Sequence, residues 1–256
     1  MPPLPDSTQD LSSHYDNRYY QERGFLDSSI TNYSRKEKLF NLAWASKWSG
    51  KDLFDGHQQT ALDAGCGVGH NSFILNEFGY RTKGVDHSIE AISAAKKRAV
   101  AEQRENMEWN IVNLDRDSLA GSFDLILCWE VIEHVQNPVA TLRQLYEALN
   151  PGGVLIITTP NRLGLSYLLL DRDPTHIHVH SSFWWARQLR LLRPAKWICR
   201  ALIFWDHVFP CLHKWPQVMA HWLPILGFRV RIAVVKSRMP QPLTGLASSA
   251  CHTCVD

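Results

Sequence analysis

The stretch Thr60–Asn71, "TALDAGCGVGHN", decides the fold of this 256-residue chain. It opens with a short apolar run, continues with glycines at 65, 67 and 69, and leads into a helical pattern. A glycine-rich turn between a strand and a helix lets the backbone approach a ligand closely, because glycine adopts conformations that other residues avoid. The stretch therefore predicts a cofactor-binding loop. It leaves open whether the cofactor is a dinucleotide, a phosphate or another nucleoside.

Strand and helix patterns alternate from this loop onward. Ser88 is expected to cap one helix, Asn137 with Pro138 to begin another, and Gly79 to end a third. Short strands joined by helices of this length predict βαβ units and a mostly parallel sheet with helices on both faces. The expected strands are 60–65, 82–86, 108–114, 123–129 and 153–160, and the expected helices are 70–78, 88–103 and 139–150, the last followed by a turn at 150–153.

Acidic residues around the loop indicate which cofactor it holds. Gly65 and Gly67 fit the dinucleotide pattern G-x-G-x-x-G, but its third glycine position is His70. Asp63 would repel a pyrophosphate and would suit a cation. Asp86 ends the next strand 21 residues after Gly65 (86 − 65), a spacing at which a carboxylate reaches a ribose diol. S-adenosylmethionine (SAM) has a nucleoside, a positive centre and no phosphate, so the residues favour it over NAD.

Four segments in order resemble the motifs of class I SAM-dependent methyltransferases. They are "ALDAGCGVG" at 61–69, "GVDHS" at 84–88, "SFDLILCWEVIEHV" at 122–135 and "LNPGGVLIITTPNR" at 149–162. The resemblance is closest to the ubiquinone-biosynthesis O-methyltransferase-like branch. It implies a Rossmann-like α/β fold with a seven-stranded, mostly parallel sheet, in which the seventh strand, at 228–237, runs antiparallel beside the fifth. The sixth strand is expected at 195–205.

The resemblance also implies a cofactor site. Asp63, Gly65, Cys66 and Gly67 would line the methionine end of SAM, Asp86 would hold the ribose, and His87 would lie beside the adenine. Asn113 and Leu114 would flank the adenine ring, and Trp129 would cover the cofactor near its methyl group. The family usually has Asp where Asn113 stands. For each of these residues a structural role, such as a turn or ordinary packing, is the alternative.

The segment "WEVIEHV" contains the residues expected to act on the methyl acceptor. Helical spacing would bring Glu130 together with Glu133 or His134 on one face. The resemblance associates Glu130, Glu133 and His134 with Mg²⁺, which would hold a catechol-like diol. The alternatives are that His134 is the catalytic base without a metal, or that the segment only supports the loop.

The segment "THIHVH" places histidines at 176, 178 and 180. In a strand these side chains would lie on one face. Relatives in the resembled branch have a similar pattern near the acceptor, so His178 is a second candidate for the catalytic site. The alternatives are a metal site and an ordered lid. The pair Cys251 and Cys254 resembles half a zinc site, but a disordered tail is expected there.

Charge is unevenly distributed along the chain. Residues 1–147 contain 15 Lys/Arg and 21 Asp/Glu, a net charge of −6, whereas residues 148–256 contain 12 Lys/Arg and 4 Asp, a net charge of +8. The overall charge of +2 gives no reason to expect nucleic acid as a partner. The basic half, with its many tryptophans, predicts either peripheral contact with a membrane, a site for an anionic acceptor, or a solvated surface.

One domain is expected. The chain is divided into a disordered N-terminus at 1–14, a methyltransferase domain at 15–238 and a disordered tail at 239–256. Within the domain, 15–56 would form N-terminal helices and 163–226 a substrate-side insertion with the late elements. Six scattered cysteines favour free thiols and a cytoplasmic location, and no leader or spanning segment is expected.

The sequence therefore predicts a SAM-dependent methyltransferase that transfers a methyl group to oxygen of a small-molecule or lipid-linked acceptor. A ubiquinone-precursor-like catechol, a sugar and a glycolipid remain open as acceptors. One alternative is a protein that binds SAM without catalysis and acts as a regulator or scaffold. The other, an NAD-dependent dehydrogenase, is disfavoured by Asp63 and His70.

Overall fold

A computed structural model describes residues 32–164, 167, 173–202 and 229–238. Its helices are α2 (Asn32–Ser49), α3 (His70–Glu77), α4 (Ile89–Ala101), α5 (Pro138–Glu147) and α7 (Ser182–Leu192). Its strands are β1 (Thr60–Ala64), β2 (Arg81–Asp86), β3 (Met107–Ile111), β4 (Phe123–Trp129), β5 (Leu149–Pro160), β6 (Lys196–Leu202) and β7 (Arg229–Val235).

The strands form one seven-stranded sheet in the order β3-β2-β1-β4-β5-β7-β6. The first five strands are parallel to one another, and β7 runs antiparallel to both β5 and β6. This is the Rossmann-like class I methyltransferase topology expected from the sequence, including the antiparallel strand beside β5. The strand order reverses between β1 and β4, so the crevice beyond the carboxyl ends of these strands is the place where this fold binds ligands.

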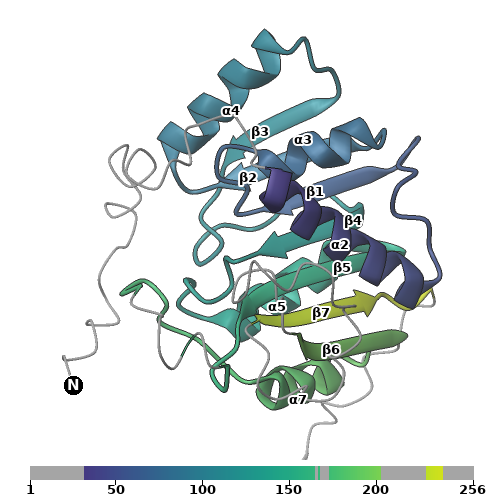
Figure 1. The fold of residues 1–256 in the computed structure, drawn as a ribbon, viewed down its shortest axis with the longest axis vertical. Helices are drawn as coiled ribbons and strands as arrows, with labels where there is room; N and C mark the ends of the chain where they lie inside the picture. Colours follow the sequence, from purple (N-terminus) through teal and green to yellow (C-terminus); the bar gives the residue numbers. More distant parts are fainter. Residues whose placement is uncertain (1–31, 165–166, 168–172, 203–228, 239–256) are drawn as a thin grey trace, which may run out of the picture.

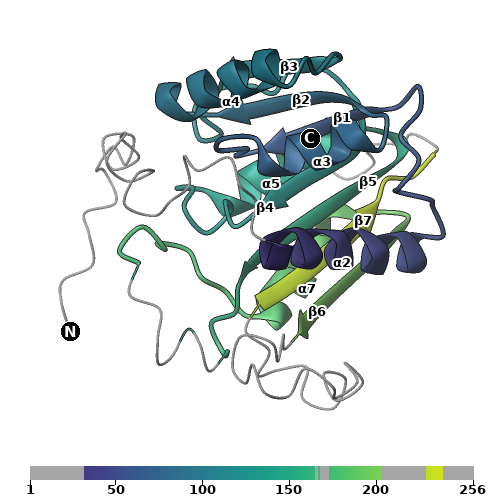
Figure 2. The ribbon, with the colours of Figure 1, turned by 45° about the horizontal axis from the view of Figure 1, so that its top comes forward.

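Helices cover both faces of the sheet (Figures 1 and 2). On one face, Leu142 of α5 and Trp185 of α7 join a buried cluster with Leu62 and Ile126 of the central strands. On the other face, residues of α2 and α3 pack on the alternate positions of the same strands, such as Ala61 and Leu125. The sheet is therefore the shared wall of two apolar cores.

The local signals at helix ends are confirmed. The Ser88 hydroxyl accepts a hydrogen bond from the Ala91 amide, and the Asn137 side chain accepts one from the Ala140 amide. Pro138 occupies the first turn of α5. Gly79 follows α3 with a φ of 89°, in the left-handed region that glycine adopts without strain. Each signal depends only on neighbours in the chain, which is why sequence alone located it.

Two local predictions were wrong. Helix α5 ends at Glu147 rather than Asn150, and the expected turn at 150–153 belongs to β5. The Phe123 amide donates to the Ala148 carbonyl, and the pairing of β4 with β5 shifts register between Phe123 and Leu125, so the extra residues form a bulged extension. Residues 176–180 form no strand. Their backbone instead turns back, with the His178 amide donating to the Glu133 carbonyl.

Helix α2 confirms a helix in the expected N-terminal region, while the part of that region before residue 32 and the 1–14 segment lie outside the described residues. The same holds for 203–228 and for the tail at 239–256, with the Cys251–Cys254 pair. No helix in the described ranges is both long and apolar enough to cross a bilayer.

Buried charge fixes α2 on the sheet. Arg231 of β7 is 1% exposed and donates to the Asn41 side chain of α2. Arg229 of β7 pairs with Glu37 of α2 at 2.6 Å. Because a fully buried arginine such as Arg231 is stabilised only when it is paired, its contacts, together with the partly exposed Arg229–Glu37 pair, determine where α2 lies. They place the first part of α2, with Lys38, near the carboxyl end of β4, and the helix runs from there along β7 (Figures 1 and 2).

Candidate functional site

The glycine loop closes the carboxyl end of β1. Gly65 and Gly67 have φ values of 72° and 53°, both in the left-handed region. A Cβ on Gly65 would lie 2.3 Å from Val131, so this glycine allows close packing against the turn after β4. A Cβ on Gly67 would meet no atom of the described residues within 4 Å. Among these residues, the backbone at Gly67 therefore faces open space, which is the feature a bound cofactor requires.

Asp86 joins this loop to the end of β2. Its Oδ2 accepts a hydrogen bond from the Gly67 amide at 2.8 Å, and its Oδ1 accepts one from the Ser88 amide at 2.9 Å. His87 lies next to it, with its Nδ1 3.6 Å from Asp86 Oδ1. Each carboxylate oxygen accepts one described backbone bond and has a second lone pair, so a ribose diol can still be held there.

Asp63 lies under the loop. It is fully buried, and its oxygens accept hydrogen bonds from the Ser72 amide and hydroxyl and from the Asn71 side chain. Burial raises the pKa of Asp63, while the bonds from Ser72 and Asn71 oppose that shift. Asp63 therefore holds the first turn of α3 in place, and its negative charge acts on the site through the loop rather than by an exposed contact.

Cys66 points away from the open side of the loop. It is buried with Phe73 and Trp109 in a third apolar cluster, and burial raises the pKa of its thiol well above the usual value. Among the four loop residues expected at the methionine end, Gly67 has open space beside it as far as the described residues show. The Cys66 side chain packs in the core, so only its backbone would line the site.

Asn113 forms a turn after β3. Its side-chain oxygen accepts a hydrogen bond from the Asp115 amide at 2.9 Å, and its own amide donates to Asp117 at 2.8 Å. Leu114 is half-buried and packs on the α5–α7 face of the sheet. The side-chain oxygen and the backbone amide of Asn113 are therefore used to shape the turn, and among the described contacts its side-chain Nδ2 is the group left for an adenine ring.

Trp129 ends β4 and has a neighbour that the sequence did not indicate. Trp129 is 8% exposed, and the Nζ of Lys38, from α2, lies 5.7 Å from the centre of its ring. Burial lowers the pKa of Lys38, and the charges of Asp63 and Glu37 oppose that shift. Lys38 lies 27 residues before Gly65 (65 − 38), and nothing in the sequence around it indicates a role in the site. Only the packing of α2 shows that it lies beside Trp129.

Glu130 begins the turn after β4 in an unusual conformation. Its φ is 55°, a strained value for a residue with a side chain. Its Oε2 lies 3.3 Å from Arg229 Nε, and Glu130 is the largest cause of the raised pKa of that arginine. Residues 132–134 form a turn rather than the helical spacing that would bring Glu130 beside Glu133 or His134, and the Glu130 carboxylate contacts Arg229 of β7.

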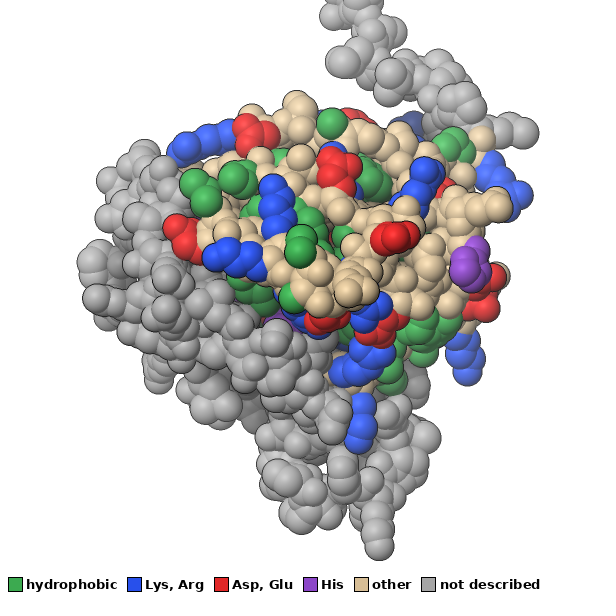
Figure 3. All heavy atoms as spheres, turned by 90° about the horizontal axis from the view of Figure 1, so that it is seen from above, with side chains coloured by type: hydrophobic (Ala, Val, Ile, Leu, Met, Phe, Trp, Pro, Cys, Tyr) green, Lys and Arg blue, Asp and Glu red, His purple; other side chains and the backbone are tan. Residues whose placement is uncertain are grey.

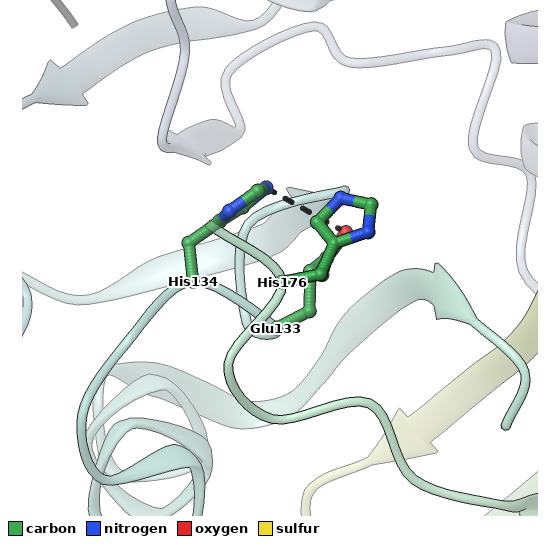
Figure 4. A group of neighbouring side chains, drawn as sticks. All are labelled: Glu133, His134 and His176. Atoms are coloured by element: carbon green, nitrogen blue, oxygen red, sulfur yellow. Dashed lines mark ion pairs between the residues drawn. The ribbon is translucent and has the colours of Figure 1, made fainter. Parts of the chain in front are cut away.

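A different group forms around Glu133 (Figure 4). One possible ligand atom from each of Glu133, His134 and His176 lies within 4.8 Å of the other two. Glu133 is fully buried, and burial, together with the charge of Glu130, raises its pKa well above the usual value. The described residues therefore do not gather the expected magnesium ligands Glu130, Glu133 and His134. They place His176 where Glu130 was expected.

The other two histidines of "THIHVH" lie in an aromatic stack. The rings of His178 and His180 stack with centroids 5.9 Å apart, and His180 stacks on Trp184 at 3.7 Å. Burial and the charges of His178 and Arg162 lower the pKa of His180 to about 4, so it is neutral at physiological pH. His178 is thus the first of three stacked rings, followed by His180 and Trp184, and its side chain is not part of the group around Glu133.

A seven-stranded sheet of this order, with a glycine loop after β1 and an acid at the end of β2, defines the nucleoside-binding class of Rossmann-like proteins. The sequence profile of a methyltransferase domain family matches residues 31–195, and the chain belongs to this family.

Curated relatives are similar over part of their length. The ubiquinone biosynthesis O-methyltransferase of Idiomarina loihiensis is 34% identical over 132 residues, which cover 48% of this chain and 54% of the relative. That of Colwellia psychrerythraea is 28% identical over 178 residues, or 65% of each chain. The chain therefore spans about half to two thirds of the length of these relatives.

Solved structures share the fold. Phosphoethanolamine N-methyltransferase 2 of Haemonchus contortus, in complex with S-adenosyl-L-methionine, has a TM-score of 0.66 at 16% identity. The match covers 89% of this chain and 59% of the Haemonchus chain. Magnesium protoporphyrin IX methyltransferase of Synechocystis PCC 6803, with bound SAH, has a TM-score of 0.61 at 15% identity. The match covers 89% of this chain and 98% of the Synechocystis chain. These similarities confirm the class I methyltransferase fold.

Replacing Asp86 by Ala is expected to weaken SAM binding by about 1–3 kcal/mol, because the cofactor hydroxyls and the Gly67 amide lose their acceptor. Isothermal titration calorimetry measures the change. Glu108→Ala is the matched control, since this exposed acid on β3 pairs only with Lys83 among the described contacts. Equal SAM affinity in Asp86→Ala and the native protein would remove Asp86 from the site.

Proposed function

We propose that this protein is a SAM-dependent methyltransferase that methylates an oxygen atom of a small molecule. One observation carries the proposal: the Asp86 carboxylate is hydrogen-bonded to the Gly67 amide, beside a backbone with open space above it. A ribose diol and an adjoining sulfonium fit this combination of an acid and an uncovered glycine. Residues 15–238 would form the single catalytic domain.

The amino-acid end of SAM would lie toward Lys38. The carboxylate of that end needs a cation, and Lys38 offers one beside Asp63 and Trp129. Trp129 would cover the methyl group, and its indole would exclude water from the reacting centre. His87, Asn113 and Leu114 would then surround the adenine at the opposite end.

Methyl transfer is an in-line displacement in which the sulfonium is already a good leaving group. The protein aligns the acceptor oxygen with the methyl carbon, and a hydroxyl acceptor must also lose its proton. We assign this proton loss to the group formed by Glu133, His134 and His176, which follows Trp129 in the chain and lies at the same edge of the sheet. His178, at the end of the ring stack, would contact the acceptor.

The names of the relatives, ubiquinone biosynthesis O-methyltransferases, support oxygen as the methylated atom. The sequence resemblance described above adds a ubiquinone-precursor-like catechol as the acceptor. Sugar and glycolipid acceptors are the alternatives within the same reaction. Incubating the protein with methyl-labelled SAM and a fractionated lipid and metabolite extract tests the proposal. Label in a product, which mass spectrometry and NMR spectroscopy assign to oxygen, is the expected result. SAM binding without transfer to any fraction would favour a non-catalytic SAM-binding protein, and stabilisation by NAD but not SAM would favour a dehydrogenase.

Replacing Lys38 by Met should raise the dissociation constant for SAM about tenfold or more, because a charged hydrogen bond to the cofactor carboxylate is lost. Binding of adenosine, which has no carboxylate, should be unchanged. Calorimetry with both ligands measures the difference. Lys36→Met is the matched control, because Lys36 is an exposed lysine two positions away on the same helix. A similar loss for SAM and adenosine would contradict the assignment of Lys38 to the carboxylate.

A second proposal concerns a membrane surface. The outer side of α7 exposes Phe183 and Leu191, at 62% and 69%, together with Arg187, Arg190 and the following Arg193. Aromatic and basic side chains on one exposed surface suit the headgroup region of an anionic bilayer. By contrast, the end of the molecule with α4 and β3 carries both signs of charge interspersed (Figure 3). We infer that α7 contacts a membrane surface peripherally. We also infer that this is the cytoplasmic surface, because Cys66 and Cys128 are free thiols, as is usual in a reducing compartment.

Replacing Arg187, Arg190 and Arg193 together by Gln should abolish most co-sedimentation with phosphatidylserine-containing vesicles at low salt. Each basic residue near the surface contributes about 1 kcal/mol, and added salt should weaken the native binding in the same way. Arg81, Lys96 and Lys97, three exposed bases at the opposite end of the sheet, supply the matched control when changed to Gln. Equal binding of both triple variants, or no binding of the native protein, would exclude α7 as the contact.

A further inference from the structure

Two arginines of β7 hold the acids that lie between α2 and the end of β4. Arg229 Nη1 lies 2.6 Å from Glu37 Oε1 of α2, and Arg229 Nε lies 3.3 Å from Glu130 Oε2. Arg231 Nη2 lies 3.6 Å from the same Glu37 oxygen. Arg229 therefore pairs with one acid from each of the two elements that it joins, and both acids are committed to arginines.

Lys38 lies in the same group of charges and makes no ion pair with a described residue. Its Nζ lies 5.7 Å from the centre of the Trp129 ring. Burial lowers the pKa of Lys38, and the nearby acids, Asp63 first among them, offset that effect only in part. A cation withdrawn from water is stabilised by an anion beside it. The Lys38 charge is therefore available to an anionic group that comes from outside the chain.

Three acids act on Lys38 by their charge, and they differ in whether they can pair with it. Asp63 holds the first turn of α3 with both of its oxygens. Glu37 is the residue before Lys38 in α2, and consecutive side chains of a helix do not face each other. Glu130 directly follows Trp129, whose ring lies beside the lysine. Released from its arginine, Glu130 is therefore the acid that would compete for Lys38.

We propose that Arg229 is a positioning residue for the cofactor. By pairing with Glu130 it keeps that carboxylate away from Lys38, so that the lysine remains open to the carboxylate at the amino-acid end of SAM. Arg229 acts through Glu130 and touches no part of the cofactor in this role. The inference rests on the proposed function, and in particular on the assignment of Lys38 to the SAM carboxylate.

A purely structural role for Arg229 makes different predictions. If Arg229 only held α2 on the sheet, its loss would weaken the binding of every ligand of the site, whatever residue stands at position 130. In the proposed role, the loss requires both an acid at position 130 and a carboxylate on the ligand. Two residues that act through one contact give non-additive effects, so a double-mutant cycle separates the two roles.

Calorimetric titration of the full chain with SAM and with adenosine tests the proposal. Arg229→Gln should raise the dissociation constant for SAM about tenfold, because Glu130 then pairs with Lys38, and should leave adenosine binding unchanged. The double variant Arg229→Gln/Glu130→Gln should bind SAM nearly as the native protein does. In a Lys38→Met background, Arg229→Gln should cause no further loss of SAM affinity, since the charge that Arg229 keeps open is absent.

A conservative variant guards against failure to fold. Arg229→Lys retains the buried positive charge, but a single ammonium group cannot hold two acids as the guanidinium fork does. It should therefore lose less SAM affinity than Arg229→Gln, and Glu130→Gln should again suppress the loss. Thermal unfolding of each variant reports whether it is folded, and this pair of lysine variants decides the question if Arg229→Gln does not fold.

Arg35→Gln is the matched control. Arg35 also joins α2 to another element by an ion pair, 2.5 Å from Glu77 of α3, and its loss should leave SAM affinity unchanged. Equal losses for SAM and adenosine in Arg229→Gln, a loss that Glu130→Gln does not suppress, or native SAM affinity in a folded Arg229→Gln protein would overturn the proposal while leaving the proposed function standing. Absence of SAM binding by the native protein would instead contradict the proposed function, and this inference with it.

Discussion

The two hydrogen bonds accepted by Asp86 hold the cofactor edge of the protein together. They join the amide of the glycine loop after β1 to the amide that begins α4, so three elements meet at one carboxylate. The loop itself can adopt this position because Gly65 and Gly67 have left-handed backbones and because Gly65 leaves room for Val131. The same geometry brings the turn after β4 beside the loop, so the acceptor groups on that turn depend on it as well.

A second constraint comes from buried charge. Arg229 and Arg231 of β7 each pair with residues of α2, and Arg229 also pairs with Glu130 at the end of β4. This network joins α2, β7 and the turn after β4. It brings Lys38 beside the Trp129 ring and pairs the Glu130 carboxylate with Arg229, so one network positions side chains on both sides of the end of β4.

Glu133 shows how closely packing and chemistry are related in this site. A carboxyl group buried this deeply is stabilised in neutral form or by a cation, and the two imidazoles next to it allow the second. The ring stack of His178, His180 and Trp184 begins two residues beyond His176, on the far side of the same segment. The segment 176–180 thus contributes His176 to the group around Glu133 and His178 to the proposed contact with the acceptor.

The sequence by itself determined the features that depend on near neighbours in the chain. Alternating apolar runs, Ser88 and Asn137 at helix starts, and the glycines of the loop indicated the sheet, its helices and the cofactor edge. The resemblance of four motifs implied seven strands, with the seventh antiparallel beside the fifth. Tertiary structure alone decided the pairing of His176 with His134 and Glu133, the approach of Lys38 to Trp129, and the contact of Glu130 with Arg229. These residues are 42 to 99 positions from their partners, and no periodic pattern encodes such distances. These contacts depend on how the charges of β7, α2 and the turn after β4 can be paired once the sheet has formed.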